Sequence, residues 1–292
     1  KSFHRVLPPQ EADLLAGINL GEKSAIDSEF RNDLVTTGTI HIIALSGYNV
    51  TIVANFLRDF FTDILKLSAR LAAWSGGIAI ILFVTLTGLQ SSAIRAGIMA
   101  IIGIYARGAG RQYQACRALA AAGTLMILYD PNYLIYDVSF QLSFLATLGL
   151  IFLTPIFEQK LARIPKKILF IIPLRELMAT TLGAQFAVLP FILYNMGTLS
   201  FISLPANVAV LPAIPFAMAL GALAGLTGMI SPMLAYPFSI AAHLLLAYIT
   251  KVISFFARVP YAAVTIHHFP LWFCFVLYIF MIWFVFRKFD KK

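Results

Sequence analysis

The chain has 292 residues, of which 60% are hydrophobic and only 12% are charged, and its formal net charge at pH 7 is +9. Because the surface of a soluble domain needs about twice this density of charge, the composition excludes an ordinary soluble domain and indicates a membrane protein. The two cysteines, Cys116 and Cys274, lie far apart in apolar runs, which excludes a disulfide framework and a cysteine-based metal cluster.

Residues 1–38 have a mixed polar composition and no basic-then-apolar signal pattern. Two short helices are predicted, over about 9–18 and 27–36, with glycines as stops. An apolar stripe on the first helix indicates that it lies against the outer membrane surface or against the helical bundle. Because the chain opens with Lys1 and not with Met, we expect it to be a piece of a longer protein.

Apolar runs fill the rest of the chain, and most of them approach the roughly 17 to 25 residues that cross a bilayer. They lie at about 39–57, 71–87, 93–106, 116–129, 139–156, 177–193, 201–229, 233–257 and 270–286. We therefore expect residues 1–38 to form an outer-face segment and residues 39–292 an all-α polytopic membrane domain with about nine hydrophobic segments.

The basic residues are distributed unevenly between the connections. Most of the 22 lysines and arginines follow the first, third and fifth apolar runs or lie in the C-terminal tail, whereas the connections after the second, fourth and sixth runs contain none. By the positive-inside rule the 158–175 connection and the C-terminus are cytoplasmic, and residues 1–38 lie outside. Most of the positive charge is therefore explained by membrane topology and not by a DNA-binding face.

The first apolar run contains polar residues that cannot all face lipid: His41, Ser46, Tyr48 and Asn49. Tyr48 is a candidate platform on which single-stranded bases stack. A serine nucleophile at Ser46 is not favoured, because no Gly-x-Ser-x-Gly motif is present.

Arg95 lies in the third apolar run, where an arginine at mid-membrane costs about 2.5 to 3.5 kcal/mol on insertion scales. One interpretation is a fixed positive charge that lines a path for an anion. The alternative is an arginine that snorkels to the interface or has a structural partner, for which Asp137 is the best candidate.

The fifth apolar run carries a polar stripe. Asp137 and Gln141 are four residues apart, as are Ser139, Ser143 and Thr147, so each series shares one helix face. The stripe faces something other than lipid. Hydrogen bonding between helices is the alternative, and it is favoured for the serines and the threonine.

The seventh apolar run contains Pro205, Pro212 and Pro215 together with Asn207. Each interior proline removes a helix hydrogen bond, and free backbone at membrane depth must be satisfied by protein or by a water-filled cavity. The pattern predicts a broken or re-entrant helix beside a conduit, with Asn207 facing it. A plain proline kink is the alternative.

Motifs of enzymes are missing from the sequence. The five histidines have no zinc-ligand spacing with a helical glutamate, and no glycine-rich phosphate loop is present. These absences argue against a metalloprotease and an ATPase. We expect a protein that is not an enzyme and that carries no cofactor and no metal.

Four motifs together resemble the competence domain of the ComEC family, the inner-membrane channel that takes up DNA in natural transformation. In chain order they are 41–50, Arg95-Ala96-x-x-Met99, 130–147 and Pro205-Ala206-Asn207-Val208. The sequence departs from the family where Tyr48 and Asn49 replace a small apolar residue and a histidine. The outer OB-like domain and the metallo-β-lactamase-like domain that family members commonly carry are not visible.

Residues and resemblance together predict a channel for single-stranded DNA in the bacterial inner membrane. Sparse positive charge and spaced hydrogen-bond donors suit such a path, because a continuous basic wall would hold phosphates too tightly. The candidate path residues are His41, Ser46, Tyr48, Asn49, Arg95, Asp137, Gln141, Ser143 and Asn207. The resemblance implies further partners: an external DNA receptor, a nuclease domain or protein, and a cytoplasmic translocation ATPase. The alternatives are a secondary transporter for a small solute, which would need acidic residues deep in the spans, and a structural scaffold.

Overall fold

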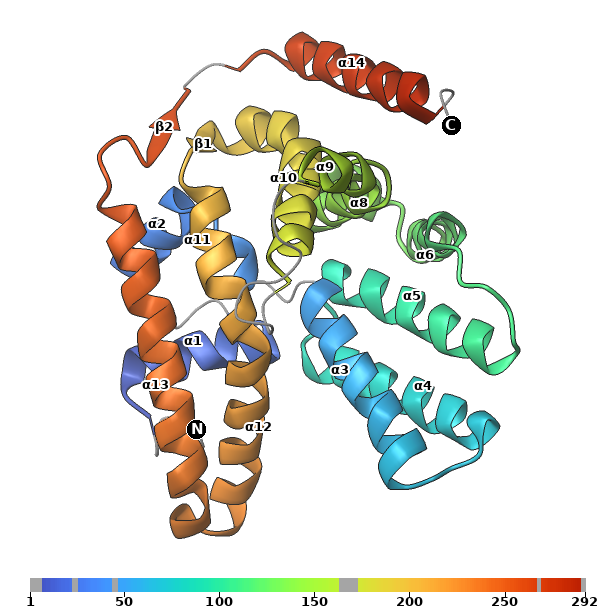
Figure 1. Ribbon diagram of the computed structural model, residues 1–292, viewed down its shortest axis with the longest axis vertical. Helices are drawn as coiled ribbons and strands as arrows, with labels where there is room; N and C mark the ends of the chain where they lie inside the picture. Colours follow the sequence, from blue (N-terminus) through green and yellow to red (C-terminus); the bar gives the residue numbers. More distant parts are fainter. Residues whose placement is uncertain (1–6, 23–25, 44–46, 163–172, 267–268, 290–292) are drawn as a thin grey trace. The chain divides into compact units, whose positions relative to one another are not determined.

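The computed structural model describes residues 7–22, 26–43, 47–162, 173–266 and 269–289 (Figure 1). Apart from two three-residue strands, β1 (Thr198–Ser200) and β2 (Ala263–Thr265), the regular structure of these residues is helical. The α-helices are α1 (Pro9–Leu20), α2 (Ser28–Thr36), α3 (Gly47–Asp59), α4 (Ala69–Leu86), α5 (Ser91–Gly108), α6 (Ala115–Tyr129), α7 (Asn132–Tyr136), α8 (Val138–Phe152), α9 (Thr154–Lys160), α10 (Leu174–Met196), α11 (Ser203–Val210), α12 (Ile214–Ile230), α13 (Pro232–Ala257) and α14 (Leu271–Phe289). The predicted all-α class is confirmed.

Fewer helices than expected are long and apolar enough to cross a membrane. Within the part of the chain that the structure describes, five stretches qualify: Ile40–Ile64, Leu174–Met196, Ser203–Ile230, Met233–Ala257 and Leu271–Lys288. A sixth is added if α8 and α9 together make one bent span. α4 and α6 are apolar but short, and two arginines lower the apolar character of α5. The expected nine spans are therefore not confirmed.

The bent helix lies at another place than the sequence indicated. α8 and α9 meet at 45°, and Pro155 stands in the first turn of α9. Between α11 and α12, in contrast, only a 3₁₀ turn over Leu211–Ala213 interrupts the α-helix. Pro205 and Pro215 fall in the first turns of α11 and α12, where a backbone N–H has no helical acceptor to lose, so these prolines do not break the stretch.

The chain divides into two compact units, each assembled from distant segments. Unit 1 comprises 1–28, 40–143 and 213–251, and unit 2 comprises 29–39, 144–212 and 252–292. The segment 1–38, which we expected to act as one piece, contributes α1 to unit 1 and α2 to unit 2.

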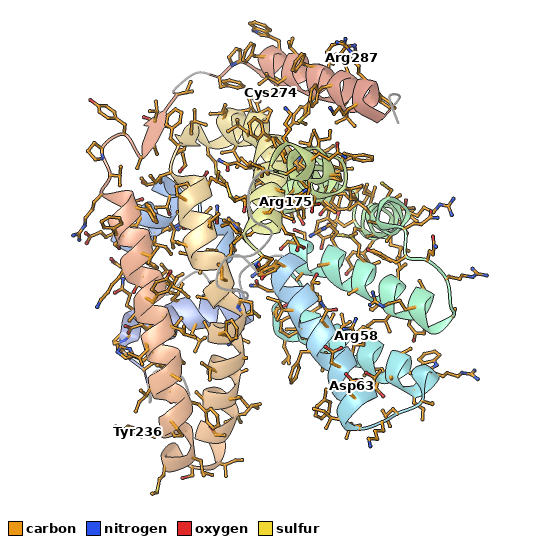
Figure 2. The ribbon with its side chains drawn as sticks, viewed as in Figure 1. Arg58, Asp63, Arg175, Tyr236, Cys274 and Arg287 are labelled. Carbon is orange, nitrogen blue, oxygen red and sulfur yellow. The ribbon has the colours of Figure 1, made fainter. Side chains whose placement is uncertain are left out.

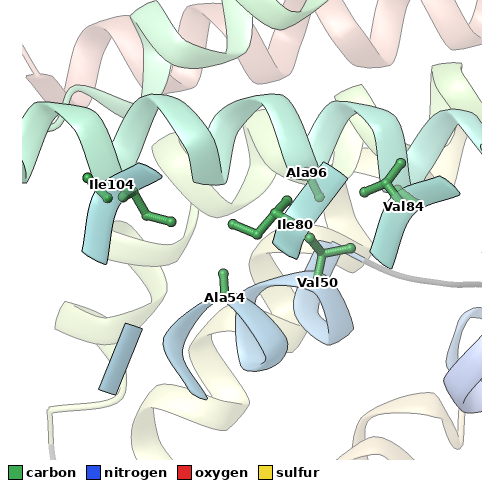
Figure 3. Close-up of a cluster of buried hydrophobic side chains, with 8 residues drawn as sticks. Val50, Ala54, Ile80, Val84, Ala96 and Ile104 are labelled. Atoms are coloured by element: carbon green, nitrogen blue, oxygen red, sulfur yellow. The ribbon is translucent and has the colours of Figure 1, made fainter. Parts of the chain in front are cut away.

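The core of unit 1 includes a packing of α3, α4 and α5 around small and β-branched side chains. Figure 3 shows this cluster, which consists of Val50, Ala54, Ala73, Ile80, Val84, Ala93, Ala96 and Ile104. A Cβ atom added at Gly97 of α5 would lie 2.9 Å from the Val84 side chain on α4. Small residues at such positions let helix backbones approach closely, which is how helices associate inside a membrane.

α1 packs against α12, and it buries Ala12, Leu14, Leu15 and Ile18. The Leu15 side chain occupies the space in which a side chain at Gly221 would stand. At a rise of 1.5 Å per residue, Gly221 lies roughly 14 Å from the end of the apolar stretch Ser203–Ile230. α1 therefore contacts the interior of a helix that is long enough to cross a membrane, and not its end. Of the two locations predicted for this helix, the structure selects the helical bundle.

Unit 2 is built on α10. Gly149 of α8 lies against the backbone of Gly183 on α10, a contact that only residues without a side chain allow. α14 docks on the same helix, where Cys274 donates to the Pro190 carbonyl and Tyr278 donates to the Ala187 carbonyl, each at 3.2 Å. Figure 2 marks Cys274 on α14. β1 and β2 pair antiparallel, with Leu199 opposite Val264.

The contact of α1 with α12 gives a first prediction. Gly221→Ala should destabilise the protein by about 1–3 kcal/mol, because its new methyl group overlaps the Leu15 side chain. The matched control is Gly228→Ala on the same helix, whose new Cβ meets Ala235 at an ordinary 3.6 Å. Thermal unfolding of the two variants in the same detergent measures the difference. Equal melting temperatures would show that α1 is not held at this position.

Candidate functional site

Buried and half-buried polar side chains of α3, of α5 and of the residue before α5 gather in unit 1 near the end of α1. Asn49 is 1% exposed, and its Nδ2 donates to the Ile18 carbonyl at 3.1 Å. Gln90 Nε2 donates to the Gly21 carbonyl at 2.8 Å. The last carbonyls of a helix have no intrahelical donor, so Asn49 replaces a missing bond of α1, and Gln90 holds the carbonyl of Gly21, the residue that follows the helix. We call Gly47, Asn49, Gln90 and Arg95 the polar junction.

Arg95 is the charged member of the polar junction. It lies in the second turn of α5 and is 7% exposed. Its Nη2 lies 2.5 Å from the position that a Cβ on Gly47 would take, and Nη1 donates to the Met99 sulfur at 3.7 Å. The guanidinium is therefore spread over the backbone at the start of α3 and does not snorkel to the surface. A side chain at position 47 would displace it.

Tyr113, in the connection after α5, is an ionisable neighbour of this region. Burial raises the pKa of its phenol above the ordinary value, and the positive charges of Arg95 and Arg107 act in the opposite direction. The ring covers Gly103, at 3.5 Å from a Cβ built there. With the raised pKa the phenol stays neutral at physiological pH, so Tyr113 does not supply a negative charge to Arg95.

Asp137 and Gln141 form the corner between α7 and α8. Asp137 Oδ1 accepts from the Phe140 backbone N–H at 2.9 Å, which caps the start of α8. Gln141 Nε2 donates to the Leu134 and Ile135 carbonyls at 2.8 and 3.0 Å, which closes the end of α7. The structure uses Asp137 as a cap, and the pairing with Arg95 that one alternative offered is not among the ion pairs of the described residues. A role of either side chain toward DNA stays a prediction.

The other candidates of the first apolar run are separated from one another. His41 is exposed in a 3₁₀ turn over Ile40–Ile42, and Tyr48 is 47% exposed at the start of α3. Ser46 lies outside the described residues. Ser143, in α8, is half-buried. Of the predicted path residues, the structure thus brings together Asn49 and Arg95.

Asn207 belongs to a second polar group, in unit 2. It is 4% exposed on α11, and its Oδ1 has no hydrogen-bond donor among the residues that the structure describes. One turn earlier on the same helix, Ser203 accepts from Gln185 Nε2 of α10. Gly38 backs onto Ser203, where an added Cβ would lie 2.7 Å from the serine Cβ. Asn207 is thus buried inside unit 2, and its predicted place facing a conduit stays a prediction.

Sequence reasoning missed Gln90, Gln185 and Glu11. Gln185 was visible as a lone amide inside an apolar run, a signal of the kind that singled out Gln141. Gln90 stands in a short connection, where polar residues are ordinary. Glu11 was assigned to an outer segment, yet its Oε1 lies 3.4 Å from His243 Nδ1 on α13. Only the docking of α1 on the bundle reveals that contact.

Apolar helices of spanning length with arginine and amide side chains buried among them define a polytopic α-helical membrane protein with internal polar sites. The profile of the competence protein family matches residues 18–291, so the chain belongs to this family, and the resemblance to ComEC is confirmed.

The comparisons also give a curated relative. The chain is 28% identical over 203 residues to "ComE operon protein 3" of Bacillus subtilis (strain 168), across 68% of this chain and 24% of that protein. The chain therefore spans about a quarter of the length of this relative. No solved structure matches this chain.

The polar junction gives a second prediction. Asn49→Ala should cost about 1–3 kcal/mol of stability, because it leaves the buried Ile18 carbonyl without its donor. The control is Asn195→Ala, since Asn195 makes a similar amide-to-carbonyl bond to Phe191 at an exposed position. Chemical unfolding in detergent compares them. A loss no larger for Asn49 than for Asn195 would mean that this bond does not hold α1.

Proposed function

We propose that the chain forms the membrane part of a route by which single-stranded DNA enters a bacterial cell during natural transformation. Membership of the competence protein family supports this function, as does the similarity to a protein of the ComE operon. The observation that carries the proposal within the structure is Arg95, a buried cation spread over the Gly47 backbone.

The polar junction has the chemistry to contact a phosphate. Gly47 is the first described residue of α3, and the Arg95 guanidinium lies over its backbone. Arg95 adds a full charge and a planar set of donors that matches phosphate oxygens. A ligand with one negative charge per nucleotide would meet a fixed cation there.

The polar junction contains little charge, which favours a site that DNA passes rather than a site that holds DNA tightly. Asn49 and Gln90, its amide members, are neutral. Each cation that contacts a phosphate strengthens binding and makes it more dependent on salt. A path has to bind well enough to admit the strand and weakly enough to release it. A single arginine with amides beside it meets both demands better than a lysine-rich wall.

We assign to this chain neither a chemical step nor the energy source. A nuclease, an external DNA receptor and a cytoplasmic translocation ATPase are proposed as partners, in line with the family resemblance. The relative from Bacillus subtilis is about four times longer than the aligned part, which leaves room for such functions in the remainder of that protein.

One observation favours the alternative, a secondary transporter for a small solute. Glu11 and His243 place an ionisable pair beside membrane helices, as coupled transporters require. The two functions predict different defects in cells that carry an inactive variant: loss of DNA uptake for the DNA route, and loss of uptake of a small solute for the transporter. Loss of DNA uptake with unchanged growth on small nutrients supports the DNA route.

For location we propose the bacterial inner membrane, with the N-terminal segment on the outer side, α1 docked into the bundle from that side, and the C-terminus inside. In a variant without Cys116 and Cys274, single cysteines at Ser28, Lys160 and Lys288 test this orientation. We expect a membrane-impermeant maleimide to label position 28 on intact cells and the other two only after permeabilisation. Labelling of position 160 from outside would overturn the orientation.

The function predicts that Arg95→Ala lowers the uptake of labelled DNA by about tenfold or more, because a charge-assisted contact is worth about 1.5–3 kcal/mol. Arg95→Lys should fall between the alanine variant and the wild type, since it keeps the charge but loses the planar donors. Uptake is divided by the amount of folded membrane protein in the same cells.

Arg107→Ala is the matched control, because Arg107 lies on the same helix and is exposed. It should leave normalised uptake unchanged. If Arg95→Ala lowers uptake and folded protein by the same factor, Arg95 serves the packing of α5 on α3 and the proposed contact is rejected.

A further inference from the structure

An acid and a base meet beside the apolar helices of unit 1. Glu11 Oε1 of α1 lies 3.4 Å from His243 Nδ1 of α13, and the two side chains are 14% and 41% exposed. His243 is roughly 15 Å from one end and roughly 21 Å from the other end of the apolar stretch Met233–Ala257. The pair therefore lies near the middle of a helix long enough to cross the membrane.

α1 brings Glu11 to this depth. With twelve residues the helix is too short to cross a membrane, and it is held by the contact of Leu15 with Gly221. Glu11 stands in the first turn of α1, where a carboxylate is favoured by the helix dipole. The acidic group therefore belongs to a docked helix and not to a solvated terminal segment.

His243 is the one cationic group within ion-pair distance of Glu11 among the described residues. The second oxygen, Oε2, is buried and accepts no hydrogen bond in the same set of residues. The geometry at Nδ1 is that of an ion pair and not of an aligned hydrogen bond. Among the described residues, compensation of a negative charge on Glu11 thus depends on whether the His243 imidazole is protonated.

The elements packed here contain few other groups that titrate. α1 carries Asp13 in addition to Glu11, and α12 carries none. On α13 the other titratable residues of unit 1 are Tyr236, Tyr248 and Lys251.

We propose that Glu11 and His243 form a proton-binding site that controls how firmly α1 is held in unit 1, where it packs on α12 and meets α13 through this pair. Histidine changes charge between about pH 5 and pH 8, by taking a proton from water onto a ring nitrogen. With the proton bound, the pair is neutral overall and attractive. Without it, a carboxylate remains uncompensated in a largely apolar environment, which is costly.

The site is connected to the polar junction through a single helix. The start of α1 carries Glu11, and its last turn holds the carbonyl that Asn49 binds. Release of α1 at the proton site therefore strains the contact at its other end, within the same unit. The proposal concerns a proton and α1, and it does not rest on the identity of the transported substrate.

Hydrogen exchange of α1 in the full chain, reconstituted in phospholipid vesicles, tests the proposal. Exchange is followed by mass spectrometry at pH 6 and pH 8 and is corrected for the intrinsic effect of pH on amide exchange. We expect the protection of α1 peptides to fall by about tenfold or more at pH 8, the scale expected when a buried pair loses one charge. Peptides of α5 should show no such difference.

Charge variants separate the proton site from general effects of pH. Glu11→Gln and His243→Gln should abolish the difference between the two pH values, and His243→Lys, which stays charged, should keep α1 protected at both. Lys251→Gln, which removes an exposed charge from the same helix as His243, is the control and should behave like the wild type. Equal protection of wild-type α1 at both pH values, or a difference that persists in His243→Gln, would overturn the proposal.

Discussion

The carbonyl end of α1 is the constraint on which the arrangement of unit 1 depends. When a helix ends inside a bundle, its last backbone carbonyls cannot bind water. Each of them needs a hydrogen-bond donor from the protein. Asn49 of α3 supplies a donor to the Ile18 carbonyl of α1, and Gln90, just before α5, supplies one to the carbonyl of Gly21, which follows α1. The same bonds tie α3 and the residue before α5 to the end of α1, and Arg95 lies over Gly47 of α3. One requirement of hydrogen bonding thus assembles the polar junction.

Small residues make these close approaches possible in both units. Gly221 admits Leu15 of α1 in unit 1, and the Gly149–Gly183 contact lets α8 meet α10 in unit 2. Inside a membrane, apolar surface alone does not drive helices together, so packing and hydrogen bonds decide which helices associate. The sites of both units are consequently built where glycines allow a polar side chain to lie against a neighbouring backbone, as at Gly47 and Gly38.

The short helix α1 makes an ionic contact and a hydrogen-bonded contact in unit 1. α1 carries an ionisable pair at its first turn and a hydrogen-bonded junction at its last. With twelve residues it is too short to span a membrane, so its place depends on these contacts. This combination suits a protein that has to admit a charged polymer without leaving a permanent opening, which is the function that we propose.

The sequence by itself determined the membrane class, the helical fold and the family, because composition, apolar runs and ordered motifs are local properties. It also singled out Arg95, Asn49 and Asn207, since polar side chains in apolar runs must avoid lipid.

The sequence did not give the number of spans or the place of the bend, because length alone does not distinguish a crossing helix from a packed one such as α4. The use of Asp137 as a helix cap was not predicted, since capping depends on where α8 starts. The contacts of Glu11 with His243 and of Gln90 with Gly21 join residues distant in sequence. Only the tertiary structure decided them, because a buried charge or carbonyl takes its partner from whichever helix packs beside it.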